Sequence, residues 1–492
     1  MSKDAIDADD RSSDHTEGAV ARVDAFVIGS GPAGQKAAVQ LAKTGRSVVV
    51  CEQLKEIGGA CVHHGTIPSK ALRERAMERG KVNERLAALN REEVDRSVSV
   101  VDLIGEMSDV VAAHDRYMTS QLSRNGVEIV HGRASFIDSH QVEVLMTTGH
   151  RKRYRANNFV IAAGSKPRHP DNVNIDHENV YDSDSILTLG YLPQSMVVLG
   201  GGVIACEYAS IFAMLGTSVT LIDRYPKPLG FLDHDLTDRF LRSFERKGGT
   251  FVGEVDLDEC VFDGISQVET RLTNGTVIHS DKVLCAQGRI SDLAAMKIEN
   301  AGLAINDRGL LGVDEHGRTS VAHIYAAGDV VGPPSLASAS MEQGRHAACH
   351  IAGLEVGALG QCIPSGIYSI PELACVGLTE SQAREQYETV VVGHADFSVI
   401  ARGHIANAKD GMLKIVVSGD GIVRGVHVVG THATDLVHIG QMGMLNNANV
   451  QTYIENVFNF PTYAESYRVA AISAAAQLAR LGQGADDSQS VA

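Results

Sequence analysis

The strongest constraint on the fold is a pattern that occurs twice: an apolar strand, a glycine-rich turn, a helix, and a second strand that ends in an acidic residue. The first copy spans residues 24–53 and the second spans 196–223. A glycine turn by itself is a weak signal, but here strand, helix, second strand and terminal acid are all in place. The chain is therefore predicted to contain two βαβ folds, each of which binds a dinucleotide.

The glycines and the terminal acid have separate tasks in such a fold. Bare backbone amides at a helix N-terminus bind a pyrophosphate, and the carboxylate at the end of the second strand accepts hydrogen bonds from ribose hydroxyls. In the first copy the candidate residues are Gly29, Gly31, Pro32, Ala33, Gly34 and Glu52. In the second copy they are Gly200, Gly202, Val203, Ile204, Ala205 and Asp223.

Composition limits the class of partner. The net charge of −16 argues against nucleic acid and against an anionic membrane as a partner. The chain has no run of about 18 apolar residues, and residues 1–20 lack the apolar core of a signal peptide, so neither a membrane span nor secretion is expected. The eight cysteines form no CxxC motif, which indicates reduced thiols in a cytoplasm, and we expect no metal site.

The stretch GGACVHHGTIPSK at 58–70 is expected to open a helix, and its Gly58 and Gly59 let backbone pass close to a bulky ligand. It resembles the active-site segment of the flavoprotein disulfide reductases, which include glutathione reductase and lipoamide dehydrogenase, and this resemblance implies that the helix lies against a flavin ring. Most members of that family have two cysteines, five residues apart, that form a redox disulfide. Here the two places hold Cys61 and Thr66. One thiol cannot close an intramolecular disulfide, so electrons that reach the flavin must leave by another route.

The stretch FNFPTYAESYRVAA at 458–471 departs from that family a second time. The family pattern is His-Pro-Thr-x-x-Glu, in which a histidine from the partner subunit handles the thiol proton. Pro461, Thr462 and Glu465 are present, but Phe460 replaces the histidine and cannot transfer a proton. The two losses are coherent, because both residues serve only thiol chemistry. With this combination the chain resembles the soluble, Si-specific pyridine nucleotide transhydrogenases from about residue 22 to 480.

This resemblance implies an α/β, glutathione-reductase-like fold with two Rossmann-like dinucleotide-binding domains, for FAD and NAD(P), and a C-terminal α+β interface domain. The segments 157–170 and 319–332 resemble the family's joining segment and its second flavin motif, so the FAD domain is expected to be split by the NAD(P) domain. The expected divisions are a disordered extension at 1–21, an FAD domain at 22–155 and 285–355, an NAD(P) domain at 156–284, an interface domain at 356–481 and a disordered tail at 482–492. The family also implies a homodimer or a larger homo-oligomer in the cytoplasm.

The implied reaction is NADPH + NAD⁺ giving NADP⁺ + NADH, a ping-pong scheme in which FAD holds the hydride between half-reactions and NAD(H) and NADP(H) are the substrates. Lys70 and Glu207 match a family lysine and glutamate that pair beside the flavin N5, where a cation favours the anionic reduced flavin. Val203 takes the place of a gating tyrosine in glutathione reductase, which leaves the nicotinamide pocket open. The candidate catalytic set is Lys70, Glu207, Cys61 and Thr66, with Cys61 interpreted mainly as packing beside the flavin. Further cofactor contacts are expected at Gly59, Lys70, Ala163, Gly164, Glu207, Gly288, Gly328 and Asp329.

The sequence gives mixed signals about nucleotide preference. Asp223 at the strand end favours NAD, because a carboxylate accepts from the 2′-hydroxyl and repels a 2′-phosphate. Arg224 and Lys227 follow it and are candidates to hold that phosphate. The preference between NAD and NADP and the direction of net flux therefore stay open.

Three other activities share the nucleotide motifs. A diaphorase would pass electrons from NAD(P)H to quinones or dyes, with no return of hydride to a nucleotide. A non-catalytic redox sensor would bind FAD and a nicotinamide nucleotide and signal by shape, but the open pocket and the Lys70 and Glu207 pair argue against it. A disulfide reductase would use Cys61 with an external thiol. Hydride transfer from NADPH to thio-NAD⁺ without added quinone separates the transhydrogenase from the diaphorase.

Overall fold

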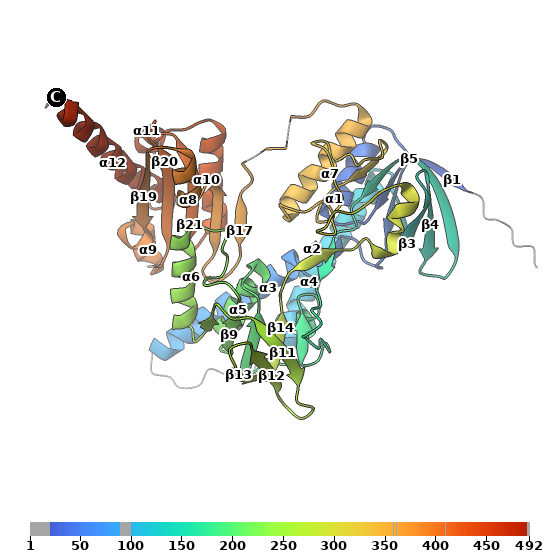
Figure 1. The fold of residues 1–492 in the computed structure, drawn as a ribbon, viewed down its shortest axis with the longest axis horizontal. Helices are drawn as coiled ribbons and strands as arrows, with labels where there is room; N and C mark the ends of the chain where they lie inside the picture. Colours follow the sequence, from blue (N-terminus) through green and yellow to red (C-terminus); the bar gives the residue numbers. More distant parts are fainter. Residues whose placement is uncertain (1–19, 89–99, 358, 361, 409, 490–492) are drawn as a thin grey trace, which may run out of the picture.

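The structure is a computed structural model that describes residues 20–88, 100–357, 359–360, 362–408 and 410–489. Figure 1 shows three bodies. The body that contains β1 and β5 lies at the right, a second body in green lies below, and a C-terminal body in orange and red lies at the left. The predicted α/β fold class, with two dinucleotide-binding folds and a C-terminal α+β part, is confirmed.

The first sheet contains the first glycine unit. Strand β1 lies between β2 and β5 and runs parallel to both, and β16 pairs with β5 in parallel. Strand β3 extends the sheet from β2 and forms an antiparallel hairpin with β4. Its strands are β1 (Ala21–Ile28), β2 (Val48–Glu52), β3 (Glu128–Asp138), β4 (Gln141–Met146), β5 (Arg151–Ile161) and β16 (Ile324–Ala326).

Helices cover this sheet and form its side of the site. Strand β2 is buried along its whole length, and β1 and β5 are buried in their C-terminal parts, because helices pack on the parallel part of the sheet. Gly344 lets α7 approach α1 closely, since a Cβ there would lie 2.1 Å from the Ala33 carbonyl oxygen. The helices on or beside this sheet are α1 (Pro32–Ala42), α2 (Gly59–His63), α4 (Val100–Arg124) and α7 (Ala337–Ala352), whereas α3 (Thr66–Ala88) extends away from the sheet and packs against α5 (Val203–Met214).

The second sheet contains the second glycine unit and is parallel throughout, in the order β10-β9-β8-β14-β7. Its elements are β7 (Val180–Asp182), β8 (Ser195–Leu199), α5 (Val203–Met214), β9 (Ser218–Ile222), α6 (His234–Arg246), β10 (Thr250–Val252) and β14 (Lys282–Cys285), with an antiparallel excursion of β11 (Leu257–Phe262), β12 (Val268–Leu272) and β13 (Val277–Ser280). Gly29 and Gly200 turn the chain at equivalent places with φ of 101° and 107°, a region that favours glycine.

The third sheet is antiparallel, in the order β17-β18-β21-β20-β19. Its strands are β17 (Ser365–Ile367), β18 (Leu373–Gly377), β19 (Val390–Asp396), β20 (Met412–Ser418) and β21 (Val423–Val429). Its helices are α8 (Glu380–Gln386), α9 (Ala401–Ala406), α10 (Ala433–Leu445), α11 (Val450–Glu455) and α12 (Glu465–Gln489). No helix among the described residues is both long enough and apolar enough to cross a membrane.

A two-stranded sheet and a charge cluster are among the connections between the bodies. Strands β6 (Ser165–Pro167) and β15 (Arg289–Ser291) pair antiparallel where the chain leaves the first sheet and returns to it. Lys414 of β20 is 2% exposed, and its Nζ lies 2.9 Å from Asp233 Oδ1, 2.7 Å from Asp235 Oδ2 and 2.7 Å from Glu380 Oε2. Asp233 is the N-cap of α6, so this charge cluster joins the third sheet to the second body. The short 3₁₀ helices are η1 (Ile186–Thr188), η2 (Ala294–Met296), η3 (Ile298–Ala301) and η4 (Phe397–Val399).

Three predicted boundaries need correction. The division at 155/156 is wrong because β5 continues through it to Ile161 as one strand of the first sheet. The disordered tail predicted at 482–492 is wrong as far as Gln489, where α12 ends. Of the extension predicted at 1–21, residues 1–19 lie outside the described residues, and Ala21 already belongs to β1.

Candidate functional site

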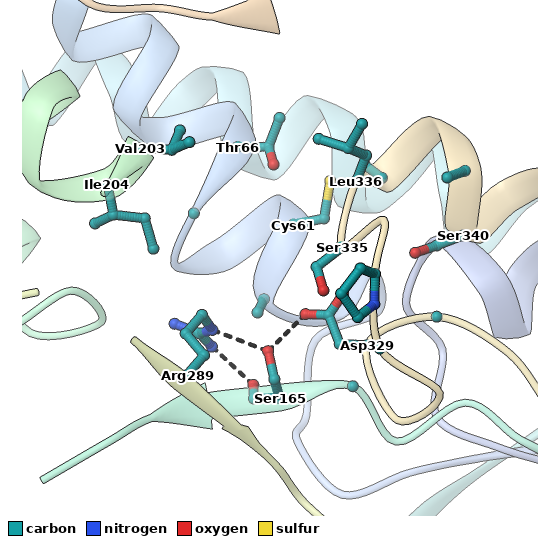
Figure 2. A pocket seen from close by; sticks show the side chains of 18 of the residues that line it. Cys61, Thr66, Ser165, Val203, Ile204, Arg289, Asp329, Ser335, Leu336 and Ser340 are labelled. Atoms are coloured by element: carbon teal, nitrogen blue, oxygen red, sulfur yellow. Dashed lines mark hydrogen bonds between the residues drawn. The ribbon is translucent and has the colours of Figure 1, made fainter. Parts of the chain in front are cut away.

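One continuous cavity of about 2040 Å³ runs between the three bodies and contains both glycine turns. Its volume is well above the roughly 300–1,000 Å³ of an ordinary small-molecule pocket, so it has room for two large ligands. Figure 2 shows part of the lining, where α2, α3 and the start of α5 face the loops after β5 and β16.

The two glycine turns fit a pyrophosphate each. Helix α1 begins after Gly31 and α5 begins after Gly202. Because both N-cap residues are glycines, no N-cap side chain occupies the first helical amides. A Cβ added to either glycine would meet no atom within 4 Å, so both face open cavity. Free amides at a positive helix end, with no side chain in the way, are what a pyrophosphate needs.

Glu52 is held in place at the end of β2. Its Oε2 accepts from the Ser30 amide at 2.9 Å and from Ser30 Oγ at 2.6 Å, and its Oε1 accepts from the Leu54 amide at 3.0 Å. The residue lines the cavity, as expected for a group that accepts from a ribose.

Asp329 belongs to a chain of hydrogen bonds between the two halves of the first body. Ser165 Oγ donates to Asp329 Oδ2 at 2.6 Å, and Arg289 Nε donates to Ser165 Oγ at 2.9 Å (Figure 2). Arg289 Nη2 also donates to the Ser165 carbonyl at 2.7 Å, and its Nη1 lies 2.8 Å from Asp184 Oδ1. The carboxylate is thus fixed at the cavity wall beside the turn that contains Gly328.

The predicted ion pair between Lys70 and Glu207 is present. Lys70 Nζ of α3 lies 2.7 Å from Glu207 Oε2 of α5, although the two residues are 137 positions apart. The Glu207 side chain is 5% exposed and the Lys70 side chain 26%, so the pair is shielded but reaches the cavity that both residues line. A fixed cation in a poorly hydrated site acts strongly on nearby charge.

Cys61 has no second thiol beside it. All eight cysteines are free, and the Thr66 hydroxyl is a neighbour of the Cys61 thiol at the junction of α2 and α3 (Figure 2). Burial raises the pKa of Cys61 above its ordinary value, although the Thr66 hydroxyl and the Lys70 charge act in the opposite direction. A thiol with a raised pKa is a poor nucleophile at neutral pH. Phe460 is 69% exposed and does not line this cavity in the described chain.

The residues after β9 divide between the cavity and its outside. Asp223 lines the cavity, and burial raises the pKa of its carboxyl above the ordinary value. Arg224 also lines the cavity and has Asp256 as a partner at 3.5 Å, with both side chains more than half exposed. Lys227 instead pairs with Asp238 of α6 at 2.5 Å and is absent from the lining. Lys227 thus points to α6 in this structure, and its contact with a 2′-phosphate stays a prediction.

The cavity brings most of the other candidates together. The lining includes Gly29, Gly31, Pro32, Ala33, Glu52, Gly59, Cys61, Thr66, Lys70, Ala163, Gly164, Gly200, Gly202, Val203, Ile204, Glu207, Asp223, Arg224, Gly288, Gly328 and Asp329. Gly34 and Ala205 lie outside it. A Cβ at Gly34 would lie 1.9 Å from the Gly29 carbonyl oxygen, and Ala205 is fully buried, so both are needed for close packing, and their contact with a cofactor stays a prediction.

Comparisons with known proteins agree with this geometry. A family model described as pyridine nucleotide-disulphide oxidoreductase matches residues 23–344, and the model of that family's dimerisation domain matches 363–471. A soluble pyridine nucleotide transhydrogenase of Azotobacter vinelandii is 42% identical over 460 residues, which cover 92% of this chain and 98% of the relative. One of Mycobacterium bovis is 39% identical over 467 residues, covering 94% and 98%. The chain belongs to the soluble pyridine nucleotide transhydrogenases of this oxidoreductase family.

Two solved structures share the fold of this transhydrogenase chain. LpdA of Mycobacterium tuberculosis matches with a TM-score of 0.84 at 25% identity, covering 92% of this chain and 99% of its own. A Cu(II) complex of the HOCl-induced flavoprotein disulfide reductase RclA of Escherichia coli also matches with a TM-score of 0.84, at 26% identity and with the same coverage.

Three residues of this transhydrogenase site escaped the sequence analysis. Ser165 and Arg289 each follow a glycine that was predicted, Gly164 and Gly288, so their positions next to cofactor glycines were an available signal. Tyr368 lies in a segment, 366–372, that resembles the family, but nothing in its local sequence shows that it lines the cavity next to Lys70.

Proposed function

We propose that this protein is an FAD-dependent NAD(P)⁺ transhydrogenase that moves hydride from NADPH to NAD⁺ in two half-reactions at one site. The observation that carries the proposal is the cavity wall itself: the Lys70 and Glu207 pair is present, while Cys61 has Thr66 as its neighbour and no second thiol. The family uses FAD with NAD(P) substrates, and relatives at 39–42% identity are named as transhydrogenases.

The residues of the first body fit FAD. The amides at the start of α1 beside Gly31 take the pyrophosphate, Glu52 accepts from a ribose, and Asp329 accepts from the ribityl chain. When bound, FAD supplies a group that accepts a hydride and later returns it. Lys70 places a positive charge beside that group, and Glu207 keeps the ammonium oriented.

The second body fits the nicotinamide nucleotide. The amides at the start of α5 beside Gly202 take its pyrophosphate, and Asp223 lies where the adenosine ribose would be expected. Val203 is a small residue at the cavity wall, so it leaves room for nucleotides to enter and leave. Arg224 is the candidate on the cavity wall for contact with a 2′-phosphate. From the bounds of β1, β5 and α12 we assign the FAD domain to 21–161 and 285–355, the NAD(P) domain to 162–284 and the interface domain to 356–489.

The third body is proposed to form a homodimer. Its match to the family's dimerisation domain is joined by a set of large apolar side chains that are half or more exposed: Met442, Leu445, Val457, Phe460 and Ile472. Large exposed apolar side chains on a body that matches a dimerisation domain are candidates for a surface that another chain covers. Sedimentation analysis is expected to give twice the mass of one chain or a multiple of it, and Val457→Asp with Ile472→Asp is expected to weaken the assembly. We also propose a cytoplasmic location, because the relatives are named soluble and all eight cysteines are free.

The decisive test is hydride transfer from NADPH to thio-NAD⁺ by the purified FAD-loaded protein, with no quinone present. Transfer at a rate comparable to steady-state NADPH oxidation supports the proposal. Rapid reduction of quinones with no thio-NADH formed would instead show a diaphorase.

A further inference from the structure

A loop of the C-terminal body reaches the ion pair at the centre of the cavity. The loop joins β17 to β18 and has the sequence YSIPE at 368–372. It contacts both helices that supply the pair, α3 and α5, even though it comes from a different sheet.

Tyr368 contacts both members of the pair. Its amide donates to Glu207 Oε1 at 2.9 Å, while Lys70 occupies the other oxygen, Oε2, at 2.7 Å. The Tyr368 ring lies under the Lys70 ammonium, with 5.0 Å from Nζ to the ring centroid. The ammonium therefore has a carboxylate and an aromatic face as partners, and Ser69 Oγ at 3.3 Å as a weaker third.

The loop is fixed by residues one helical turn beyond the pair. On α3, Arg73 Nε donates to the Ser369 carbonyl at 3.1 Å, and its Nη2 lies 3.0 Å from Glu372 Oε1. On α5, Ser210 Oγ accepts from the Ile370 amide at 3.0 Å. Because Arg73 follows Lys70 by three residues and Ser210 follows Glu207 by three, each helix presents a pair member and a loop anchor on one face.

These anchors are buried. Arg73, Ser210, Ser369 and Ile370 are each at most 5% exposed, so the hydrogen bonds are shielded from water. A lysine has a long flexible stem, and its ammonium stays at one point only if its surroundings fix it there. Glu207 alone fixes one direction, and the Tyr368 ring fixes a second.

We propose that Tyr368 is a positioning residue for hydride transfer. From the C-terminal body, it holds the Lys70 ammonium against Glu207 and so fixes the position of the positive charge beside the flavin. The proposal rests on the function proposed above, because it assigns to Lys70 a role beside the flavin. It also makes the C-terminal body part of the redox site in addition to its part in assembly.

The test uses the FAD-loaded protein and compares Tyr368→Leu with Tyr368→Phe. The leucine variant loses the aromatic face, so its bound flavin is expected to have a more negative midpoint potential and to be reduced by NADPH about fivefold more slowly, in line with the usual strength of a cation–π contact. The phenylalanine variant keeps the ring and is expected to match the original protein in both measurements. Tyr191→Leu is the matched control, since it removes a comparable contact with Lys282, at 5.2 Å, outside the cavity lining.

An unchanged potential in Tyr368→Leu, an equal shift in Tyr368→Phe, or an equal shift in Tyr191→Leu would each overturn the proposal. If Tyr368→Leu fails to fold or to hold FAD, Ser210→Ala decides, because it removes only a loop anchor: a negative shift with full FAD content supports the positioning role, and an unchanged potential refutes it. Midpoint potentials measured against redox dyes need no nucleotide turnover. If the original protein fails to reduce thio-NAD⁺, the transhydrogenase proposal fails, while the potentials still test the role of Tyr368.

Discussion

Lys70 and Glu207 meet at 2.7 Å across two helices that come from different bodies of the molecule. The contact brings together the helix that follows the Cys61 segment and the helix of the second glycine turn. It therefore fixes how the proposed flavin side and nicotinamide side of the cavity face each other.

Removing one member of this pair should cost stability as well as rate. Lys70→Met leaves the Glu207 carboxylate buried with the Tyr368 amide as its remaining partner, so the free energy of unfolding should fall by about 2 kcal/mol, less than for a fully buried pair because Lys70 is partly exposed. Reduction of bound FAD by NADPH should slow about 30-fold, as for loss of a preorganised electrostatic group. Stopped-flow absorbance and chemical denaturation measure the two effects.

The double variant Lys70→Met with Glu207→Gln serves as the control. Because it removes the unpaired charge, its loss of stability should be smaller than the sum of the two single losses. Strictly additive losses would show that the pair contributes no coupling energy.

Asp223 should control the choice between nucleotides. Asp223→Asn removes a carboxylate that repels a 2′-phosphate, so the Michaelis constant for NADPH should fall more than that for NADH. Arg224→Ala should raise the NADPH constant, whereas Lys227→Ala should have a smaller effect because Lys227 faces Asp238. Equal changes for NADPH and NADH in Asp223→Asn would reject this role.

The same residue predicts a dependence on pH. Burial raises the pKa of Asp223, so the folded protein favours the protonated carboxyl, and ionisation costs stability as the pH rises through that raised pKa. At neutral pH Asp223→Asn should therefore be slightly more stable than the original protein. The ratio of the NADPH to NADH Michaelis constants should fall as the pH is lowered toward the pKa, and this trend should vanish in the asparagine variant.

Restoring the missing cysteine should restore a disulfide but not a reductase. In Thr66→Cys the new thiol would stand next to Cys61 and form a disulfide with it on oxidation. Thiol titration after unfolding should then find two thiols fewer in the oxidised variant, and treatment with NADPH before unfolding should restore them. The original protein should show the same thiol count before and after NADPH, because its eight cysteines are free. Turnover of an external disulfide should stay low until Phe460→His is added, since a proton carrier is still missing.

The charge cluster around Lys414 should make the junction between the second and third bodies sensitive to acid. Burial acts to raise the pKa values of Asp233, Asp235 and Glu380, but hydrogen bonds from Lys414 more than offset it, so all three lie below their ordinary values. Carboxylates with depressed pKa values contribute stability above their unfolded pKa of about 4, and this contribution is lost as the pH falls through the folded pKa.

Lys414→Met should therefore lower the free energy of unfolding by about 3 kcal/mol at neutral pH, and the gap should narrow below about pH 4. Denaturant titrations at several pH values measure this. Lys152→Met, which breaks an exposed pair with Glu128 at 3.1 Å, is the control and should cost less than about 1 kcal/mol at any pH. A gap for Lys414→Met that is constant with pH would contradict the account.

The sequence patterns predicted features that depend on local backbone geometry. Gly29, Gly31 and Glu52 lie where the first βαβ pattern requires, because the turn, the helix and the strand end are set by neighbouring residues. Side-chain positions that depend on partners far away in the sequence were harder to predict. Lys227 turned away because Asp238 presents a carboxylate one helix later, and Tyr368 reached Lys70 only through the packing of a third sheet. The division at 155/156 failed for a similar reason: β5 must run to Ile161 to pair with β1.

The most direct test is an anaerobic experiment in two steps. Protein with bound FAD is first reduced by one equivalent of NADPH, freed of NADP⁺, and then mixed with NAD⁺ while flavin absorbance is followed. The account predicts that NAD⁺ restores the oxidised flavin spectrum and that NADH appears in equal amount. A reduced protein that gives nothing to NAD⁺ but readily cleaves a disulfide compound would contradict it.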